Sequence, residues 1–294
     1  MKRFQICFLT LILFFIDCIN SSYICNAKIN ISPTPNSTVA IDRLEKIKQK
    51  GVLTIVSSNN PPFSFLDSET GKLTGIDGDI ITEVAKRLGV NKVEMKITTF
   101  DKLFTEILAD DEIDMIVSGI YITEPRKEYV NFSTPWYKDY DIFVVPELSN
   151  IQFMSQLKDK VVGALAGAVD EPYVRKLKEE GIIKDFILFS NQPELLNAVN
   201  SGKVVIGISD AITFPYLLQK DKKLRLRSLN EIPIAPDIMG EVAAGIRHED
   251  TTLLSAVNEK INEMKRDKTF SQIVKKYGVN ENSIIPPPPY FHLN

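Results

Sequence analysis

Short apolar runs alternate with amphipathic segments along most of the chain, and this alternation predicts an α/β fold. The runs are rich in β-branched residues and end at turn residues, as buried strands do. Between them lie segments whose apolar residues recur at helical spacing, such as Ile80, Ile81, Val84, Ala85 and Leu88. Strand, helix and strand in succession favour a mostly parallel sheet with helices on its faces.

The predicted elements fall into two series. The first has a helix at 42–50, a strand at 52–56, a hairpin at 65–73, a helix capped by Asp79, a strand at 93–97, a helix from Phe100, a strand at 113–117 and a helix start at Thr123-Glu124-Pro125. The second follows an extended run at 142–146 and has strands at 161–165, 186–189 and 204–208, with helices at 173–180 and 192–201. An extended run at 241–246 and helices at 251–265 and 269–277 close the pattern.

Ligands of parallel sheets bind beyond the carboxyl ends of the strands. The loops at 57–63, 98–101 and 118–126 all follow strands of the first series, so we expect them to share one rim. The second series has its own strand-end loops at 165–171 and 209–211. The sequence therefore predicts a recognition cleft formed by strand-end loops.

The segment 118–126 is the most informative of these loops. It leads from a buried strand through Gly119 to a helix start at Glu124, which gathers free backbone N–H groups at one point. Arg126, in the first turn of that helix, adds a planar guanidinium with five N–H donors. This geometry suits a carboxylate, so we predict an anion site here.

The N-terminus has the pattern of a secretory signal. Lys2 and Arg3 precede an apolar run at 6–16 that is too short to span a bilayer, and Ala27 offers a small residue for cleavage. We therefore predict a signal peptide at 1–27 and a protein exported to the periplasm or the extracellular face of the membrane. An uncleaved anchor is the alternative.

Two further segments lack the pattern of a folded element. Residues 28–41 are predicted to be a flexible leader, and residues 280–294 a proline-rich tail. A lipoprotein is disfavoured, because neither Cys18 nor Cys25 follows the small residues of a lipobox.

Composition narrows the possible functions. The full chain has a net charge of −3; cleavage after Ala27 would leave 33 basic residues (35 less Lys2 and Arg3) and 37 acidic ones (38 less Asp17), a net charge of −4. Such a protein is not suited to nucleic acid. Cleavage would also remove all three cysteines.

The remaining residues favour binding over catalysis. Without cysteines, the two isolated histidines, His248 and His292, cannot form the usual zinc site. The chain has no Gly-x-Ser-x-Gly elbow and no glycine-rich phosphate loop. We therefore expect no metal, no cofactor and no enzymatic activity of the common hydrolase, kinase or dehydrogenase kinds.

The order of several motifs from about Gly51 to Gly278 resembles one family. These motifs are Val52-Leu53-Thr54-Ile55-Val56, Pro61-Pro62-Phe63, Gly71 to Asp79, Ile113-Asp114, Ile122 to Arg126, Phe132 to Tyr137, and Asp267 to Tyr277. The family is that of the extracytoplasmic solute-binding proteins of ABC importers, of the polar amino-acid-binding type. The resemblance implies a two-lobe periplasmic-binding-protein fold (type 2) with two hinge crossovers, with lobe 1 at 42–143 and 241–279 and lobe 2 at 147–238.

The resemblance also implies how a ligand is held. The Arg matching Arg126 pairs with the α-carboxylate of the ligand, and the Asp matching Asp210 holds its α-ammonium. Phe100 matches an aromatic that stacks on the ligand side chain. Together the implied ligand-binding residues are Asn60, Phe63, Phe100, Ser118, Gly119, Tyr121, Arg126, Gly167, Ala168, Val169, Asp170 and Asp210.

Departures from the family pattern bear on the ligand. The family often has an acid where Ser57 stands, so its absence argues against arginine or lysine and favours a polar or neutral amino acid. Tyr121 and the segment 165–170 resemble the branch that binds ectoine-type solutes, which makes a cyclic zwitterion the second choice. The expected partners are this ligand and a membrane permease, with the protein a monomer.

Two other functions stay open at this level. Cyclohexadienyl dehydratases resemble these binding proteins but add an active-site carboxylate, for which Glu171 is the only candidate. A sensory domain is the second possibility, although no second membrane span or signalling segment follows residue 278.

Overall fold

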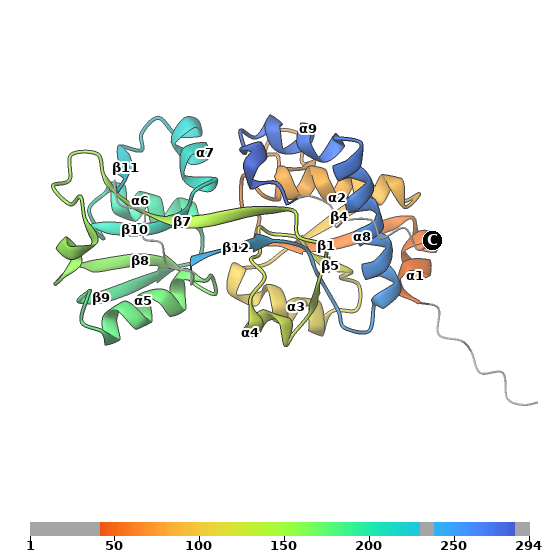
Figure 1. Ribbon diagram of the computed structural model, residues 1–294, viewed down its shortest axis with the longest axis horizontal. Coiled ribbons are helices and arrows are strands. Elements are labelled where there is room, and N and C mark those ends of the chain that lie inside the picture. The colour runs from red at the N-terminus through yellow and green to blue at the C-terminus, as the bar shows by residue number, and fades with distance from the viewer. Residues whose placement is uncertain (1–41, 230–237, 286–294) are drawn as a thin grey trace, which may run out of the picture. The chain divides into compact units, whose positions relative to one another are not determined.

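Two β-sheets organise the protein in a computed structural model that describes residues 42–229 and 238–285 (Figure 1). Sheet 1 has the strand order β4 (Lys92–Ile97), β1 (Val52–Ser57), β5 (Met115–Ile116), β13 (Gly245–Ile246), β6 (Asn131–Phe132). Sheet 2 has the order β11 (Leu226–Ser228), β7 (Tyr137–Pro146), β10 (Ile206–Asp210), β8 (Val161–Leu165), β9 (Asp185–Phe189), with β12 (Met239–Val242) paired to β7. A hairpin of β2 (Phe65–Leu66) and β3 (Leu73–Thr74) stands apart from both.

Helices cover both faces of sheet 1. They are α1 (Arg43–Lys50), α2 (Ile76–Arg87), α3 (Leu103–Ala109), α8 (Thr251–Arg266) and α9 (Thr269–Lys276), with the short α4 (Glu124–Lys127) following β5. Leu53 and Ile55 of β1 pack with α2, α8 and α9, whereas Val56 packs with α3 on the opposite face. Burial on both faces explains why these strands appear in the sequence as continuous apolar runs.

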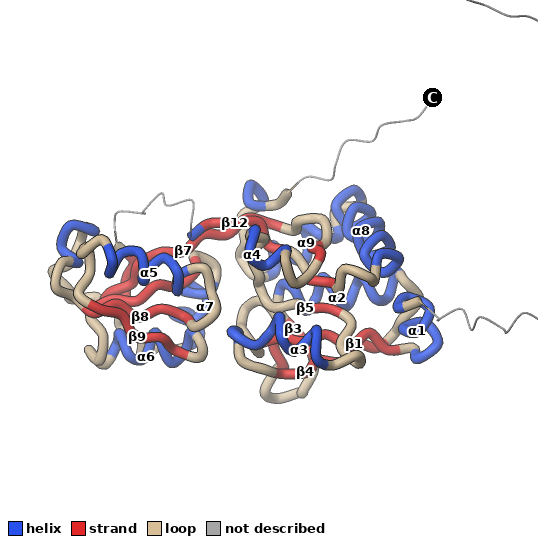
Figure 2. The backbone as a smooth tube through the Cα atoms, turned by 90° about the horizontal axis from the view of Figure 1, so that it is seen from below, coloured by secondary structure: helices blue, strands red, loops and turns tan. Residues whose placement is uncertain are grey.

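Sheet 2 is covered in the same way by α5 (Asp170–Glu179) and α6 (Gln192–Asn200), and α7 (Thr213–Lys220) follows β10. Phe143 of β7 packs with buried side chains of α5 on one face of the sheet, and Val144 packs with those of α6 on the other face. Successive side chains of a strand point to opposite faces. We call the part built on sheet 1 lobe 1 and the part built on sheet 2 lobe 2. Figure 2 shows helices on either side of each sheet.

The chain passes between the sheets at two places. Residues 137–140 of β7 pair antiparallel with 239–242 of β12, and β7 then continues into sheet 2, where it pairs with β10 and β11. β13, just after β12, lies in sheet 1 (Figure 1). At the start of this pair the Trp136 N–H donates to the Val242 carbonyl (2.7 Å). The predicted two-lobe α/β fold with two crossovers is confirmed.

One helix start differs from the prediction. Helix α2 begins at Ile76 and not after Asp79, because its first N–H groups donate to the carbonyl oxygens of Pro62 and Phe63 (2.7–3.1 Å). Backbone groups of the preceding loop thus replace a side-chain cap. The Asp79 carboxylate instead accepts from the Tyr277 hydroxyl (2.8 Å).

Other differences concern the ends of elements and one helix that the sequence pattern did not predict. Helix α5 begins at Asp170, three residues before the predicted start, and β7 begins at Tyr137, before the predicted run at 142–146. Helix α7 (Thr213–Lys220) was not predicted. The remaining predicted strands and helices are present with small shifts at their ends.

Several predictions concern segments outside the described residues. These are the signal peptide, the leader, the Pro286–Pro289 run and the stretch 230–237 of the predicted lobe 2, so the exact lobe boundaries remain predictions. The described start of the tail is bound to the fold, since the Ile285 N–H donates to the Trp136 carbonyl (3.1 Å). Among the described residues, no helix combines the length and the apolar character needed to cross a membrane.

Candidate functional site

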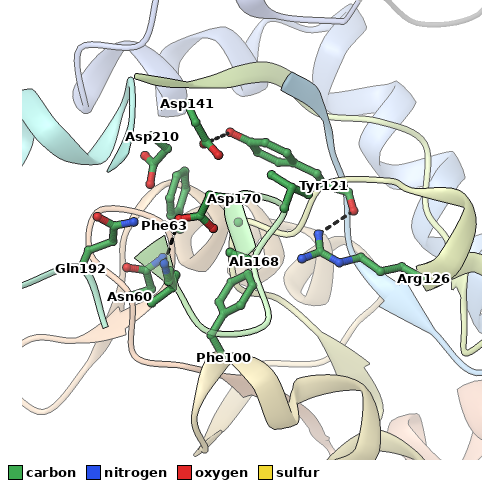
Figure 3. A pocket seen from close by; sticks show the side chains of 13 residues that line it. Asn60, Phe63, Phe100, Tyr121, Arg126, Asp141, Ala168, Asp170, Gln192 and Asp210 are labelled. Atoms are coloured by element: carbon green, nitrogen blue, oxygen red, sulfur yellow. Dashed lines mark hydrogen bonds between the residues drawn. The ribbon is translucent and has the colours of Figure 1, made fainter. Parts of the chain in front are cut away.

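A pocket lies where the carboxyl ends of parallel strands from both sheets meet (Figure 3). It contains about 390 Å³ of space not filled by protein atoms, part of it open to solvent. The residues that line it are Asn60, Phe63, Phe100, Gly119, Tyr121, Arg126, Asp141, Leu165, Ala168, Val169, Asp170, Gln192 and Asp210. Ten of the twelve residues implied by the family resemblance are therefore brought together at one place.

Arg126 provides a buried cation at this pocket. Only 9% of the residue is exposed, and its guanidinium donates to the carbonyl oxygens of Tyr121 (2.9 Å) and Gly167 (3.1 Å). It also lies over the rings of Phe100 and Phe104, 5.7 and 5.5 Å from their centroids. Burial lowers the pKa of Arg126 to about 10, so the group stays charged at neutral pH.

No ion pair joins Arg126 to a carboxylate within the described part of the chain. The helix start that positions it has the predicted cap, because the Thr123 side chain accepts from the Arg126 backbone N–H. A buried cation that has neutral hydrogen-bond partners but no counter-ion is suited to an anionic ligand group.

Tyr121 is anchored by both crossing strands. Its hydroxyl donates to the Asp141 carboxylate on β7 (3.2 Å), and its backbone forms a bridge with Val242 of β12. Gly240 of β12 lies so close that a Cβ there would be 3.0 Å from the Tyr121 Cβ. Burial raises the pKa of Tyr121, so its hydroxyl stays protonated and remains a donor.

Three buried carboxylates line the pocket from lobe 2. Asp141 of β7 and Asp210 of β10 are directly opposite partners in the antiparallel ladder. Asp210 also accepts from the Thr213 N–H (2.6 Å), and Asp170 accepts from the Leu165 N–H (2.8 Å).

Burial has the same effect on all three acids. It raises the pKa of Asp141 and of Asp210, and it raises the pKa of Asp170 to about 7. Repulsion from neighbouring carboxylates adds to the rise at Asp141 and Asp170. Asp139, two residues before Asp141 on the same side of β7, is buried as well, and its pKa is also raised by burial and by Asp210.

Ser118 and Gly167 were predicted to contact the ligand, but neither lines the pocket. The Ser118 hydroxyl accepts from the Ser58 N–H (3.1 Å), so it holds two loops together. Gly167 lies against lobe 1: a Cβ at this position, where φ is +77°, would be 2.5 Å from the Asp101 Cα. Gly119 lines the pocket, but its N–H donates to Asp77 (2.7 Å) and is not free for a ligand.

Three lining residues were not among the predicted ligand-binding residues: Asp141, Leu165 and Gln192. Two of them carried a usable signal. On β7, Asp141 lies on the same face as Tyr137 and Asp139, and Lys138 and Tyr140 lie on the exposed face. Because side chains alternate between the two faces of a strand, this pattern places the Asp141 carboxylate on the buried face.

Gln192 is the first residue of α6, three residues after the end of β9, a position that the strand-end rule would have included. As to metals, residues 42–229 and 238–285 contain no group of three or more His, Cys, Asp or Glu side chains placed to hold an ion.

Two lobes around a pocket of this kind define a binding protein of the two-lobe periplasmic type. The chain belongs to the bacterial extracellular solute-binding proteins, family 3, whose family model matches residues 53–280.

Individual relatives agree with the family. The chain is 29% identical over 223 residues to the lysine/arginine/ornithine-binding periplasmic protein of Escherichia coli K12, covering 74% of this chain and 83% of that one. It is 28% identical over 240 residues to the L-cystine-binding protein TcyJ of the same strain, covering 80% and 85%. Among solved structures, an ancestral arginine-binding protein bound to arginine is 30% identical, with a TM-score of 0.69 over 77% of this chain and 98% of that one.

Proposed function

We propose that this protein binds an amino acid in the pocket between its lobes and delivers it to the permease of an ABC importer on the extracytoplasmic side of the membrane. The family and the amino-acid ligands named for its relatives support the proposal. In this proposal Arg126 of lobe 1 pairs with the α-carboxylate of the ligand, and Asp210 of lobe 2 accepts from its α-ammonium.

The observation that carries the proposal is the separation of opposite charges across one pocket. Arg126 has no ion-pair partner among the described residues, while Asp210 lines the same pocket from the other lobe. An α-amino acid carries both complementary charges a few bonds apart, so one ligand can satisfy both lobes. Binding then favours the closed arrangement, as in other hinged two-lobe proteins.

The alternatives from the sequence lack comparable support. Tyr121, which suggested an ectoine-type ligand, donates its hydroxyl to Asp141, and the relatives described above are named for amino acids. Glu171, the candidate catalytic acid, does not line the pocket. Burial opposes ionisation of Glu171, but the Gly167 N–H and Arg175 outweigh it and lower its pKa, which does not suit a proton donor.

The test is a calorimetric titration of the common amino acids, ectoine and hydroxyectoine into the parent protein and an Arg126→Met variant. Removing the partner of a ligand carboxylate costs roughly 2–5 kcal/mol, so we expect the variant to bind at least about 30-fold more weakly. Arg175→Met, which removes a half-exposed Arg paired with Glu171, is the matched control and should bind normally. Equal affinity of the parent and the Arg126 variant would refute the carboxylate assignment.

A further inference from the structure

The pocket has more negative than positive groups. Asp141, Asp170 and Asp210 line it together with one guanidinium, that of Arg126. Asp141 and Asp210 are opposite each other in the ladder, where Cβ atoms lie about 4.5–5.5 Å apart and like charges repel. A protein gains no stability from this arrangement, so it calls for a ligand that supplies positive charge.

Two unused acceptors point the same way. The Asp170 Oδ1 and the Gln192 Oε1 are buried and have no hydrogen-bond partner among residues 42–229 and 238–285, and the two residues are only 2% and 4% exposed. Both residues line the pocket, and in Figure 3 Gln192 and Asp210 lie on the side away from Arg126. Buried acceptors without a donor are rare in native proteins, so a ligand with several N–H groups fits this wall.

A neutral amino acid would leave most of the acceptors on this side of the pocket, those of Asp141, Asp170 and Gln192, without a charged partner. Its α-ammonium has three N–H donors, which Asp210 and its neighbours can accept. Asp141, Asp170 and Gln192 would still lack a cationic partner. The usual acid position, Ser57, is fully buried and hydrogen-bonded to Ser64, so it does not line the pocket, and its identity says little about ligand charge.

Building on the proposed function, we infer that the ligand is an amino acid with a second cationic group, held by Asp141 and Asp170 with Gln192 as a further acceptor. This reverses the preference for a neutral ligand that the sequence suggested from Ser57.

The charged groups around the wall add a second expectation. Asp139, Asp141, Asp170, Asp210, Tyr121 and Arg126 face one another here, and burial raises the pKa of each of the four acids, that of Asp170 to about 7. Carboxyl groups that are protonated in the empty pocket must ionise to pair with a cation. Binding of a cationic ligand therefore releases protons, and its affinity increases as the pH is raised through neutrality.

The experiment compares amino acids that differ only in side-chain charge. Arginine with citrulline and lysine with norleucine are matched pairs, titrated calorimetrically into the parent protein at pH 7.5. We expect at least one cationic member to bind about 30-fold or more tightly than its neutral counterpart. Repeating the titration in buffers of different ionisation enthalpy should show more proton release for the cationic member than for its neutral counterpart, because Asp210 pairs with the α-ammonium of both.

Two isosteric variants test whether Asp141 and Asp170 hold the second cationic group of the ligand. Asp141→Asn and Asp170→Asn keep the shape and an acceptor oxygen, so each should reduce the ratio of the cationic to the neutral affinity about tenfold. Asp185→Asn, which removes an exposed carboxylate paired with Lys178, is the control and should keep the full preference.

The outcomes separate this inference from the proposed function. Equal binding of both members of each pair refutes the inference and leaves the proposed function intact. A cationic preference that survives both variants refutes the assignment to Asp141 and Asp170. Absence of binding by any amino acid to the folded parent protein refutes the proposed function and the inference with it.

Discussion

Two buried groups of charges in this protein are built in opposite ways. The paired cluster in lobe 1 consists of the buried side chains of Arg43, Asp114, Arg247 and Asp250, joined by Asp111 at the surface. Here Arg43 contacts Asp111, Asp114 (3.5 Å) and Asp250 (3.4 Å), and Arg247 contacts Asp250 (3.2 Å). Each carboxylate of this cluster thus has an arginine partner.

The pocket cluster of Asp141, Asp170, Asp210 and Arg126 lacks such pairing. Two of its acids face each other across a strand pair, and Arg126 forms no ion pair within the described residues. The comparison shows that burial of charge alone does not mark a functional site. In the pocket cluster the buried charges are incompletely paired, and under the proposed function a bound ligand completes the pairing.

The largest expected effect comes from breaking the paired cluster. Asp250→Asn keeps the shape but leaves Arg247 without a counter-ion, which should lower the free energy of unfolding by about 3 kcal/mol. Urea denaturation measures this, and ligand affinity of the folded variant should stay unchanged. An unchanged urea midpoint would show that the pairing contributes little and would remove the contrast between the clusters.

A second substitution tests whether a ligand pairs with the charges of the pocket cluster only when the two lobes are in contact. Gly167→Ala places a Cβ against Asp101 of lobe 1, so closing around a ligand becomes harder, and affinity should fall about tenfold, or about 1.4 kcal/mol. Gly181→Ala is the matched control, because Gly181 also has a positive φ (+69°) but no atom within 4 Å of the added Cβ. Equal losses of affinity in the two variants would mean that backbone strain alone is responsible.

The smallest expected effect is an increase in the free energy of unfolding, where Asp250→Asn is expected to lower it. Asp141→Asn removes one of two opposed carboxylates and should stabilise the ligand-free protein by about 1 kcal/mol at pH 8. Because the folded state raises the pKa of Asp141, it binds more protons than the unfolded state above about pH 4, and stability of the parent declines as pH rises.

Thermal denaturation from pH 4 to 8 checks this sign. The gain from Asp141→Asn should be smallest at pH 4, where the carboxyl group is protonated in the folded state and still partly protonated in the unfolded state, and should increase toward pH 8. A loss of stability at pH 8 would show that the hydrogen bond from the Tyr121 hydroxyl outweighs the repulsion between Asp141 and Asp210, and it would contradict the contrast with Asp250.

Local patterns predicted most of the fold. Apolar runs located β1, β4, β8, β9 and β10, and Gly51 ended α1 as expected, because these signals depend on neighbours in sequence. The start of α2 was wrong because its cap comes from Pro62 and Phe63, more than ten residues earlier. A cap supplied by distant backbone leaves no trace in the local residues.

The site was predicted unevenly for the same reason. Arg126 and Asp210 follow strands in recognisable motifs, whereas Asp141 matters because it is opposite Asp210, and that register depends on which strands pair. Ser57 carries less information about the ligand than its place in the motif suggested, since it is buried among Ser64 and Ser118, and that burial depends on how distant loops pack. Which residue lies opposite Asp141 depends on how the strands of the sheet pair, and the sequence of either strand alone does not show it.

The pairing of Trp136 with Val242 has a practical consequence. Trp136 is the only tryptophan of the 294 residues, it is fully buried, and it lies where the two crossing strands begin to pair. Emission excited at wavelengths that tyrosine does not absorb therefore comes from a single indole beside the crossovers. The protein has a built-in optical probe at the point about which its lobes would move, with no label attached.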